Sequence, residues 1–134
     1  MRIGIDIDDT ICRTTELVDK RMKEYARKRK IDVLDVINHE LEKENFYYEY
    51  LPSIYEEVEI KRNVSSVIHR LRSKRNKIYL ISGRSRKQVP KEIDIWRITD
   101  DWLKKNNLIV DGIVYAAYGE NKANVCKREK IDLM

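Results

Sequence analysis

The sequence predicts an α/β fold: a Rossmann-like, mostly parallel sheet with helices on both faces and a small helical insert. Three observations predict it. Short apolar strands alternate with helical patterns, polar residues directly follow the strands, and one long helical stretch separates the first strand from the others. Strands that alternate with helices are typical of parallel sheets with right-handed crossovers. The length of 134 residues suits a single domain.

The first predicted element is a strand over residues 2–7, in which isoleucine occupies every second position. Residues 13–63 then contain helical patterns, interrupted by an expected aromatic break at 46–52. This stretch is too long for a simple crossover between strands. We therefore assign 13–63 to a small helical insert and interpret 1–12 and 64–134 as a discontinuous core.

The remaining elements follow from apolar spacing and from turn residues. Apolar residues at i, i+3, i+4 and i+7 indicate a helix over residues 64–74. Thr99 is expected to cap the helix before the third strand, with Asp100 and Asp101 in its first turn. The other expected elements are strands at 77–81 and 112–116, a short helix that ends near residue 128, and the start of a further strand at 131–134.

Lysine and arginine are concentrated in residues 61–91, where eleven of them occur without a single Asp or Glu. The whole chain has a net charge of +5. A basic stretch of this kind attracts nucleic acid or a small anionic substrate. No aromatic residue is interleaved with the basic residues at 70–77, so we favour a solvated helix face there. Nucleic acid is the less favoured partner.

The composition excludes a membrane-spanning protein and a disulfide-stabilised secreted domain. No apolar run approaches the ~18 residues that span a bilayer, and the N-terminus becomes acidic too early for a signal peptide. Cys12 and Cys126 form no disulfide framework, so we interpret both as small buried apolar residues. The expected location is the cytoplasm, and no membrane partner is expected.

Polar side chains follow three of the predicted strands. Asp6 and Asp8 follow the first strand, Ser82 closes the second, and Lys122 comes after the third. Since the carboxyl ends of parallel strands meet at one edge of a sheet, we expect these residues to lie together. Two crowded carboxylates are costly unless a cation shares the site, and magnesium prefers hard oxygen ligands. The pattern predicts a site for a phosphate group and Mg²⁺.

Residues 6–10, Asp-Ile-Asp-Asp-Thr after an apolar strand, resemble the first motif of the haloacid dehalogenase superfamily of phosphohydrolases. Residues 81–84, Ile-Ser-Gly-Arg, are similar to its second motif, and Lys122 fits the third, with Lys127 as the alternative. In this family a small cap is inserted between the first two motifs, where this chain has its helical insert. Residues 99–103, followed by an aspartate at 111 and a strand, are similar to the deoxyribonucleotidase-like branch.

The resemblance implies a role for each matching residue. Asp6 would be the nucleophile that forms an aspartyl-phosphate. Asp8 would act as general acid and then as general base. Ser82 would bind the phosphoryl group and Lys122 would neutralise charge around Asp6. Magnesium would be held by the Asp6 carboxylate and the Asp8 main-chain carbonyl. The implied substrate is a small phosphorylated molecule, with a nucleoside monophosphate as the best candidate.

Further residues at the same edge are candidates for phosphate binding. These are Thr10, Gly83 and Arg84, together with Ser82 and Lys122. For Arg84, Arg86 and Lys87 we consider both a contact with a second phosphate or acidic leaving group and plain solvation. Tyr47, Tyr48 and Tyr50 are candidates for lining a substrate pocket or for packing the insert against the core.

One departure from the family pattern concerns its fourth motif, an acidic residue after the fourth strand. The sequence ends within that expected strand, and Asp132 is a poor substitute. We therefore expect the C-terminal part of the core to be missing, and interpret the chain as a piece of a longer protein rather than a naturally short form. Such a chain is expected to be weak or inactive, and to dimerise through the incomplete side of the sheet.

Other classes compete with the phosphatase interpretation. A signalling receiver needs its phospho-acceptor aspartate at the end of a middle strand, where this sequence has Ser82. A non-catalytic scaffold that kept the fold stays open, as does a nucleic-acid-binding module built on the basic stretch at 61–91. We favour the magnesium-dependent phosphomonoester hydrolase.

Overall fold

The computed structural model describes residues 1–134 and contains one parallel sheet of three strands in the order β1-β2-β3. The strands are β1 (Arg2–Asp6), β2 (Lys77–Ser82) and β3 (Gly112–Tyr115). The helices are α1 (Thr14–Arg29), α2 (Val33–Asn38), α3 (Glu40–Glu57), α4 (Val64–Ser73), α5 (Ile95–Lys105) and α6 (Lys122–Arg128), with a short 3₁₀ turn η1 (Arg86–Gln88). The α/β prediction is confirmed.

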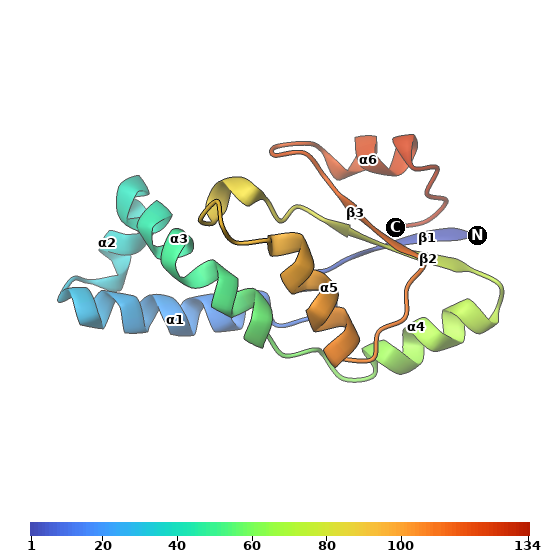
Figure 1. Cartoon of the computed structure of the whole chain (residues 1–134), viewed down its shortest axis with the longest axis horizontal. Helices are drawn as coiled ribbons and strands as arrows, with labels where there is room; N and C mark the ends of the chain where they lie inside the picture. The colour runs from blue at the N-terminus through green and yellow to red at the C-terminus, as the bar shows by residue number, and fades with distance from the viewer.

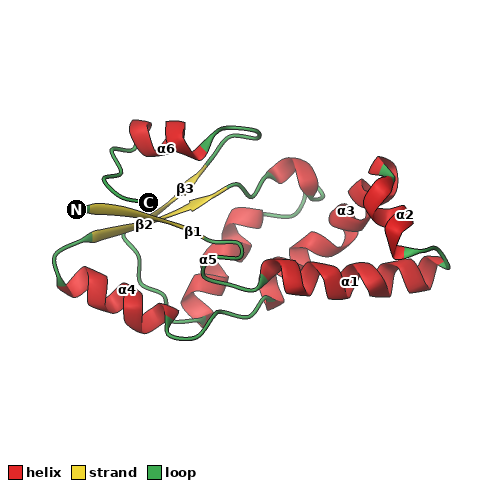
Figure 2. Ribbon diagram, turned by 180° about the vertical axis from the view of Figure 1, so that it is seen from behind, coloured by secondary structure: helices red, strands yellow, loops and turns green.

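Helices cover both faces of the sheet, as predicted (Figure 1). On one face, Ile78 and Leu80 of β2 pack into a buried cluster with Ile68 of α4 and Trp102 of α5. On the other face, Ile81 packs against Val125 of α6. Figure 2 shows α4 and α6 on opposite sides of the strands. The alternation of β2 side chains between the two faces follows from the two-residue period of a strand.

The expected fourth strand begins beside β1. Leu133 forms a single parallel bridge with Ile3, and its carbonyl accepts a hydrogen bond of 2.8 Å from the Gly4 amide. The Asp132 carboxylate accepts a hydrogen bond of 2.7 Å from the Arg2 amide. Asp132 therefore lies at the start of β1, at the opposite end of this strand from Asp6.

The aromatic break expected at 46–52 is wrong, because α3 runs through it without interruption and includes Pro52. Phe46, Leu51 and Ile54 are buried at helical spacing, and Phe46 meets Tyr25 of α1 with ring centroids 5.5 Å apart. Burial of this face outweighs the hydrogen bond that a proline removes from a helix interior.

The helices α1, α2 and α3 lie beyond one end of the sheet and share a second buried cluster (Figure 1). This cluster also contains Val89 and Ile95, which come from the segment after β2. The helical stretch between β1 and α4 is therefore packed against part of the chain that we assigned to the core. The division into an insert at 13–63 and a core at 1–12 and 64–134 stays a prediction.

Helix α5 begins one turn earlier than expected. Its N-cap is Asp94, whose carboxylate accepts hydrogen bonds from the amides of Trp96 and Arg97. Thr99 is instead buried inside the helix, where its hydroxyl donates to the Ile95 carbonyl at 2.9 Å. The cap prediction for Thr99 is wrong because Asp94 offers the same capping chemistry five residues earlier in the chain. Lys104 and Lys105 occupy the last turn.

Cys12 is buried, as expected, whereas Cys126 is half-buried, and both are free thiols. Burial raises the pKa of the Cys12 thiol above its ordinary value. No helix combines the length and the apolar composition that crossing a membrane requires.

Candidate active site

The turn after β1 fixes the acidic residues that begin the site. The Ile7 carbonyl accepts hydrogen bonds from the amides of Thr10 and Ile11, and Asp9 adopts a left-handed backbone conformation with φ of 63°. Asp9 points outward, where its carboxylate binds the amide and the hydroxyl of Thr15. These hydrogen bonds lower the pKa of Asp9. Asp9 is thus occupied in shaping the turn.

Asp6, the last residue of β1, meets Lys122, the first residue of α6. The Lys122 Nζ lies 2.7 Å from Oδ1 of Asp6, which also accepts a hydrogen bond of 3.0 Å from the Ile7 amide. The other oxygen, Oδ2, accepts no hydrogen bond from the chain. Asn121 caps α6 and holds Lys122 at its start, whereas Lys127 lies in the last turn. Lys122, and not Lys127, is the lysine beside Asp6.

Asp8 forms a two-point ion pair with Arg84. The Nη2 and Nε atoms of Arg84 lie 2.8 Å and 3.2 Å from Oδ1 and Oδ2 of Asp8. The hydroxyl of Thr14 donates to Oδ1 at 2.7 Å. Both oxygens of Asp8 are therefore engaged by donors from the chain.

The Arg84 side chain has no exposed surface. Its Nη1 donates to the Thr99 hydroxyl at 3.0 Å, and its guanidinium carbon lies 3.9 Å from the centroid of the Tyr55 ring. Burial acts to lower the pKa of the guanidinium, but the hydrogen bonds to Asp8 and the charge of Asp8 together outweigh burial and raise it. Plain solvation of Arg84, one of the two alternatives from the sequence, is wrong.

Ser82 ends β2 and is almost completely buried, with 1% of its surface exposed. Its Oγ accepts a hydrogen bond of 3.1 Å from the Arg84 amide, and its own hydroxyl hydrogen has no acceptor in the chain. No hydrogen bond joins Ser82 directly to Asp6 or Lys122. Thr10 and Gly83 are exposed, and nothing would contact a side chain at Gly83. The catalytic and binding roles of all these residues stay predictions.

A magnesium ion would have two oxygens of the chain within this site. They are an oxygen of the Asp6 carboxylate and the main-chain carbonyl of Asp8, which accepts no hydrogen bond from the main chain. No group of three or more His, Cys, Asp or Glu side chains is arranged to hold a metal ion. The donor set fits magnesium, which commonly binds one or two carboxylates together with water and substrate phosphate.

The sequence does not indicate three residues that surround the ion pair of Asp8. Thr14, Tyr55 and Thr99 come from α1, α3 and α5 and meet only in the folded chain. The one available signal is the position of Arg84, because an arginine that follows a buried strand so closely needs an anionic partner.

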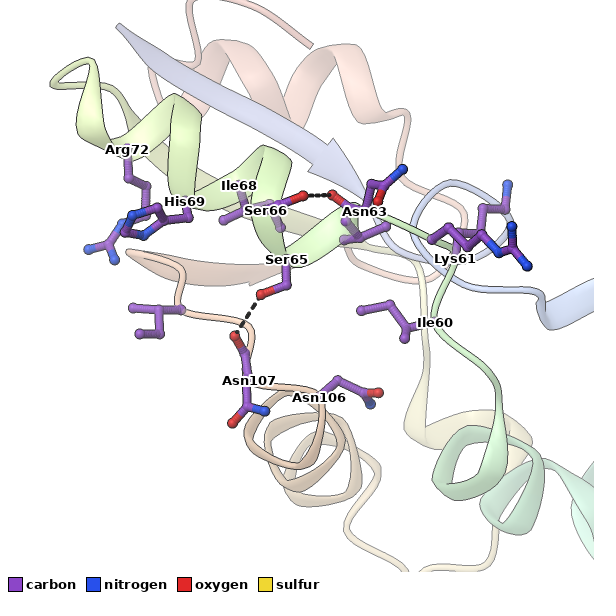
Figure 3. Close-up of a pocket in the computed structure, with 13 residues that line it drawn as sticks. Ile60, Lys61, Asn63, Ser65, Ser66, Ile68, His69, Arg72, Asn106 and Asn107 are labelled. Carbon is purple, nitrogen blue, oxygen red and sulfur yellow. Dashed lines mark hydrogen bonds between the residues drawn. The ribbon is translucent and has the colours of Figure 1, made fainter.

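A separate hollow lies away from this site (Figure 3). It measures 710 Å³ and is formed by the start of α4, the end of α5 and the segment before α4. Ser65 donates a hydrogen bond to the Asn107 carbonyl across it, and His69 lines its wall. None of the predicted site residues reaches this hollow.

Comparison with known proteins gives one informative likeness, and it concerns the fold. No family model matches the chain, and no curated protein matches it. Among solved structures, the chain is similar to a hydrolase from Streptococcus pneumoniae TIGR4, with a TM-score of 0.57 and 14% identity. The similarity covers 98% of this chain and 78% of the other. At this identity the likeness shows a shared fold.

Proposed function

We propose that this chain is a magnesium-dependent phosphomonoester hydrolase that works through an aspartyl-phosphate on Asp6. The observation that carries the proposal is the pair of Asp6 and Lys122 at the sheet edge, in which one carboxylate oxygen is held and the other has no partner. The shared fold with a solved hydrolase supports the reaction class. Nucleoside monophosphates are the proposed substrates, on the resemblance of 99–103 and Asp111 to the deoxyribonucleotidase-like branch.

In the first step, the Asp6 carboxylate attacks phosphorus while the bond between phosphorus and the ester oxygen breaks. The alcohol leaves with a proton from Asp8. Lys122 offsets the negative charge that gathers beside Asp6, and Ser82 donates its free hydroxyl hydrogen to a phosphoryl oxygen. In the second step, water attacks phosphorus, Asp8 takes its proton, and Asp6 leaves as a carboxylate with release of inorganic phosphate.

Proton transfer by Asp8 requires a rearrangement of Arg84. Both Asp8 oxygens accept hydrogen bonds from this guanidinium in the absence of substrate. A bound phosphate offers the guanidinium another anionic partner with matching geometry. Release of one Asp8 oxygen by Arg84, with uptake of a proton from solvent at that oxygen, is therefore part of the proposed cycle.

Magnesium would be held by the Asp6 carboxylate and the Asp8 main-chain carbonyl. When bound, it supplies positive charge that reduces repulsion between the carboxylate and the phosphate. The protein's own part is to hold the oxygen donors at the strand end and to place Ser82 and Lys122 around the phosphoryl group.

The experiment is a rate measurement with an aryl phosphate in the presence of magnesium, of EDTA, and of EDTA followed by excess magnesium. Because the acidic residue of the fourth motif is missing, we expect weak hydrolysis with magnesium, loss of hydrolysis with EDTA, and recovery when magnesium is restored. Hydrolysis that persists in EDTA contradicts the metal dependence. No hydrolysis of any phosphomonoester in magnesium contradicts the enzymatic function.

The full engagement of Asp8 by Arg84 and Thr14 favours one alternative, a scaffold that kept the fold without catalysis. Such a scaffold needs neither magnesium nor a free carboxylate. Isothermal titration with magnesium separates the two functions, because the hydrolase binds the ion at the strand end and an Asp6→Asn variant binds it more weakly. A scaffold shows no difference between the two proteins.

A further inference from the structure

Two adjoining hollows lie between the end of β3 and α3. The first measures 540 Å³ and its wall includes Arg84 and Ala116, whose amide donates to the Ser82 carbonyl at 2.8 Å. The second measures 690 Å³ and reaches Tyr48 of α3. The hollows share Lys87 and Tyr118, so they form one surface, which we call the aromatic trough.

Aromatic rings line the trough with much of their surface in contact with solvent. Tyr118 is 67% exposed, Tyr48 is 54% exposed and Trp96 is 38% exposed. Trp96 is stacked on Tyr115, with ring centroids 5.1 Å apart and an angle of 28° between the planes. Exposed aromatic faces beside a hollow are platforms on which planar ligands stack.

Two cations lie on these rings. The guanidinium carbon of Arg86 lies 3.8 Å from the centroid of Trp96, and the Lys87 Nζ lies 5.1 Å from the centroid of Tyr118. No carboxylate forms an ion pair with Arg86 or Lys87, although Arg84 and Arg128 have such partners. Arg86 and Lys87 are therefore positioned to bind an external anion, and the flat Arg86 group adds a stacking surface.

Acidic residues also occur along the trough. Glu120 is held by Arg128 and by the Ala117 amide, while Glu92 and Asp94 lie on the far side of Arg86. Glu40 and Glu44 border the half near α3, together with one lysine, Lys43. Unpaired positive charge is therefore concentrated in the half of the trough that η1 and the loop after β3 line.

The sequence shows no interleaving of basic and aromatic residues at 70–77, and for that reason nucleic acid was the less favoured partner. The fold supplies this interleaving at another place. Trp96, Tyr115 and Tyr118 come from α5, β3 and the loop that follows β3, and they face the basic pair of η1.

We propose that the aromatic trough binds single-stranded nucleic acid, with bases stacked on Tyr118, Tyr48 and the Arg86–Trp96 pair and phosphates facing Arg86 and Lys87. A single strand is the fitting ligand because its base faces are free, whereas those of a duplex are already stacked. A strand with a terminal phosphate would then be a further substrate class beside nucleoside monophosphates, a step that rests on the proposed hydrolase function.

The test is fluorescence anisotropy with a labelled oligothymidylate of about eight nucleotides, within the range of site sizes known for single-strand binders. Binding is measured in EDTA so that no turnover occurs. Tyr118→Leu removes the ring but keeps an apolar side chain, and Tyr118→Phe keeps the ring. We expect Tyr118→Leu to weaken binding by about 5- to 100-fold and Tyr118→Phe to leave it nearly unchanged.

A matched pair of double variants separates a local site from diffuse attraction. Arg86→Ala with Lys87→Ala removes two charges in the trough, and Arg70→Ala with Lys74→Ala removes two exposed charges at α4 and its C-terminal end. The double variant of Arg86 and Lys87 removes two phosphate contacts. Each contact contributes ~0.7 to the slope of the logarithm of the binding constant against the logarithm of the salt concentration, so this slope is expected to become shallower by about 1.4. Equal weakening by both variants, or equal binding of thymidine monophosphate and the oligomer, overturns the proposal.

Phosphate release from the same oligomer, synthesised with a terminal phosphate, distinguishes this inference from the proposed function. If the oligomer binds in the trough but no phosphate is released, nucleic-acid binding is supported and the hydrolase function is contradicted. If the chain hydrolyses an aryl phosphate but does not bind the oligomer, the hydrolase function is supported and nucleic-acid binding in the trough is overturned.

Discussion

Arg84 is a charged side chain without exposed surface, and it is tolerated there because every face of the guanidinium has a partner. Asp8 and Thr99 accept its hydrogen bonds, and the Tyr55 ring lies against it. A buried charge that keeps its partners costs little, whereas loss of one partner leaves the other uncompensated.

We expect Arg84→Met to lower the free energy of unfolding by about 2–4 kcal/mol. The reason is that Asp8, which is 29% exposed, would lose its cation and keep only the Thr14 hydroxyl. Urea unfolding followed by circular dichroism measures the change. Arg86→Met serves as the control. Arg86 is exposed and forms no ion pair with a carboxylate, so this substitution is expected to change stability little. Equal stability of Arg84→Met and the wild type would contradict the importance of this ion pair.

Lys122 and Lys127 provide a matched pair for the reaction. We expect Lys122→Met to lower kcat/KM by about 10²–10³-fold, because one preorganised charge at a developing anion contributes on that scale. Lys127→Met, in the last turn of the same helix, is expected to keep its activity. Steady-state kinetics with an aryl phosphate measures both. Loss of activity in Lys127→Met with full activity in Lys122→Met would reverse the assignment.

At the scale of single elements, Asp111 joins the end of α4 to the starts of β2 and β3. Its Oδ2 accepts a hydrogen bond of 2.8 Å from the Ile78 amide of β2, and its carboxylate pairs with Arg72 of α4. It directly precedes β3. The hydrogen bond from the Ile78 amide, followed by that from Arg72, lowers the pKa of Asp111 below its ordinary 3.8.

A lowered pKa in the folded state means that Asp111 stabilises the fold only when ionised. This contribution is fully present above pH 3.8 and is lost as pH falls through the lower folded pKa. We expect Asp111→Asn to lower stability at pH 7 by about 1–2 kcal/mol and to flatten the acid side of the stability profile. Urea unfolding of both proteins between pH 2 and pH 7 measures how the free energy of unfolding depends on pH. If stability of the variant falls with pH as steeply as that of the wild type, the role of Asp111 is contradicted.

The elements also show where sequence patterns succeed and fail. Apolar alternation predicted the first strand, because a half-buried strand has a two-residue period that few other structures share. Apolar spacing and turn residues predicted the other two strands. The helix over 40–57 was missed at its centre because clustered tyrosines and Pro52 mask its apolar face, which is defined only by packing against α1. Thr99 was misplaced because Asp94 and Thr99 are both capping residues and tertiary contacts decide between them.

At the scale of the whole molecule, α5 joins the two buried clusters. Its first residue, Ile95, belongs to the cluster of α1, α2 and α3, and Trp102 belongs to the cluster beneath the sheet. The Trp102 indole also donates a hydrogen bond of 2.8 Å to the Val58 carbonyl, directly after α3. Because one rigid helix spans both clusters, we expect them to unfold together.

Phe46→Ala tests this coupling. Truncation of a buried phenylalanine costs about 3–5 kcal/mol, and the site lies in the cluster far from the strands. We expect amide hydrogen exchange to become faster in α3, and to become faster by the same factor at Ile78 and Leu80 in β2. Faster exchange confined to α1, α2 and α3 would show that the helical stretch opens independently of the sheet.

The candidate site follows the same division between local and tertiary information. Its strand-end residues are visible in the sequence because topology alone brings strand ends to one edge. The contacts of Arg84 and the rings of the aromatic trough are not visible in the sequence. Tyr55, Trp96 and Tyr118 come from distant segments, and no regular spacing in the sequence indicates that they meet their cations in the fold.

The central claim is that the Asp6 carboxylate captures phosphorus. Its most direct test is rapid acid quenching of the protein with an aryl phosphate and magnesium, followed by peptide mass spectrometry. We expect a phosphoryl group on the peptide that contains Asp6, and neither this adduct nor turnover in Asp6→Asn. Undiminished turnover by Asp6→Asn, or phosphate release without any phosphorylated Asp6 peptide, would contradict the account.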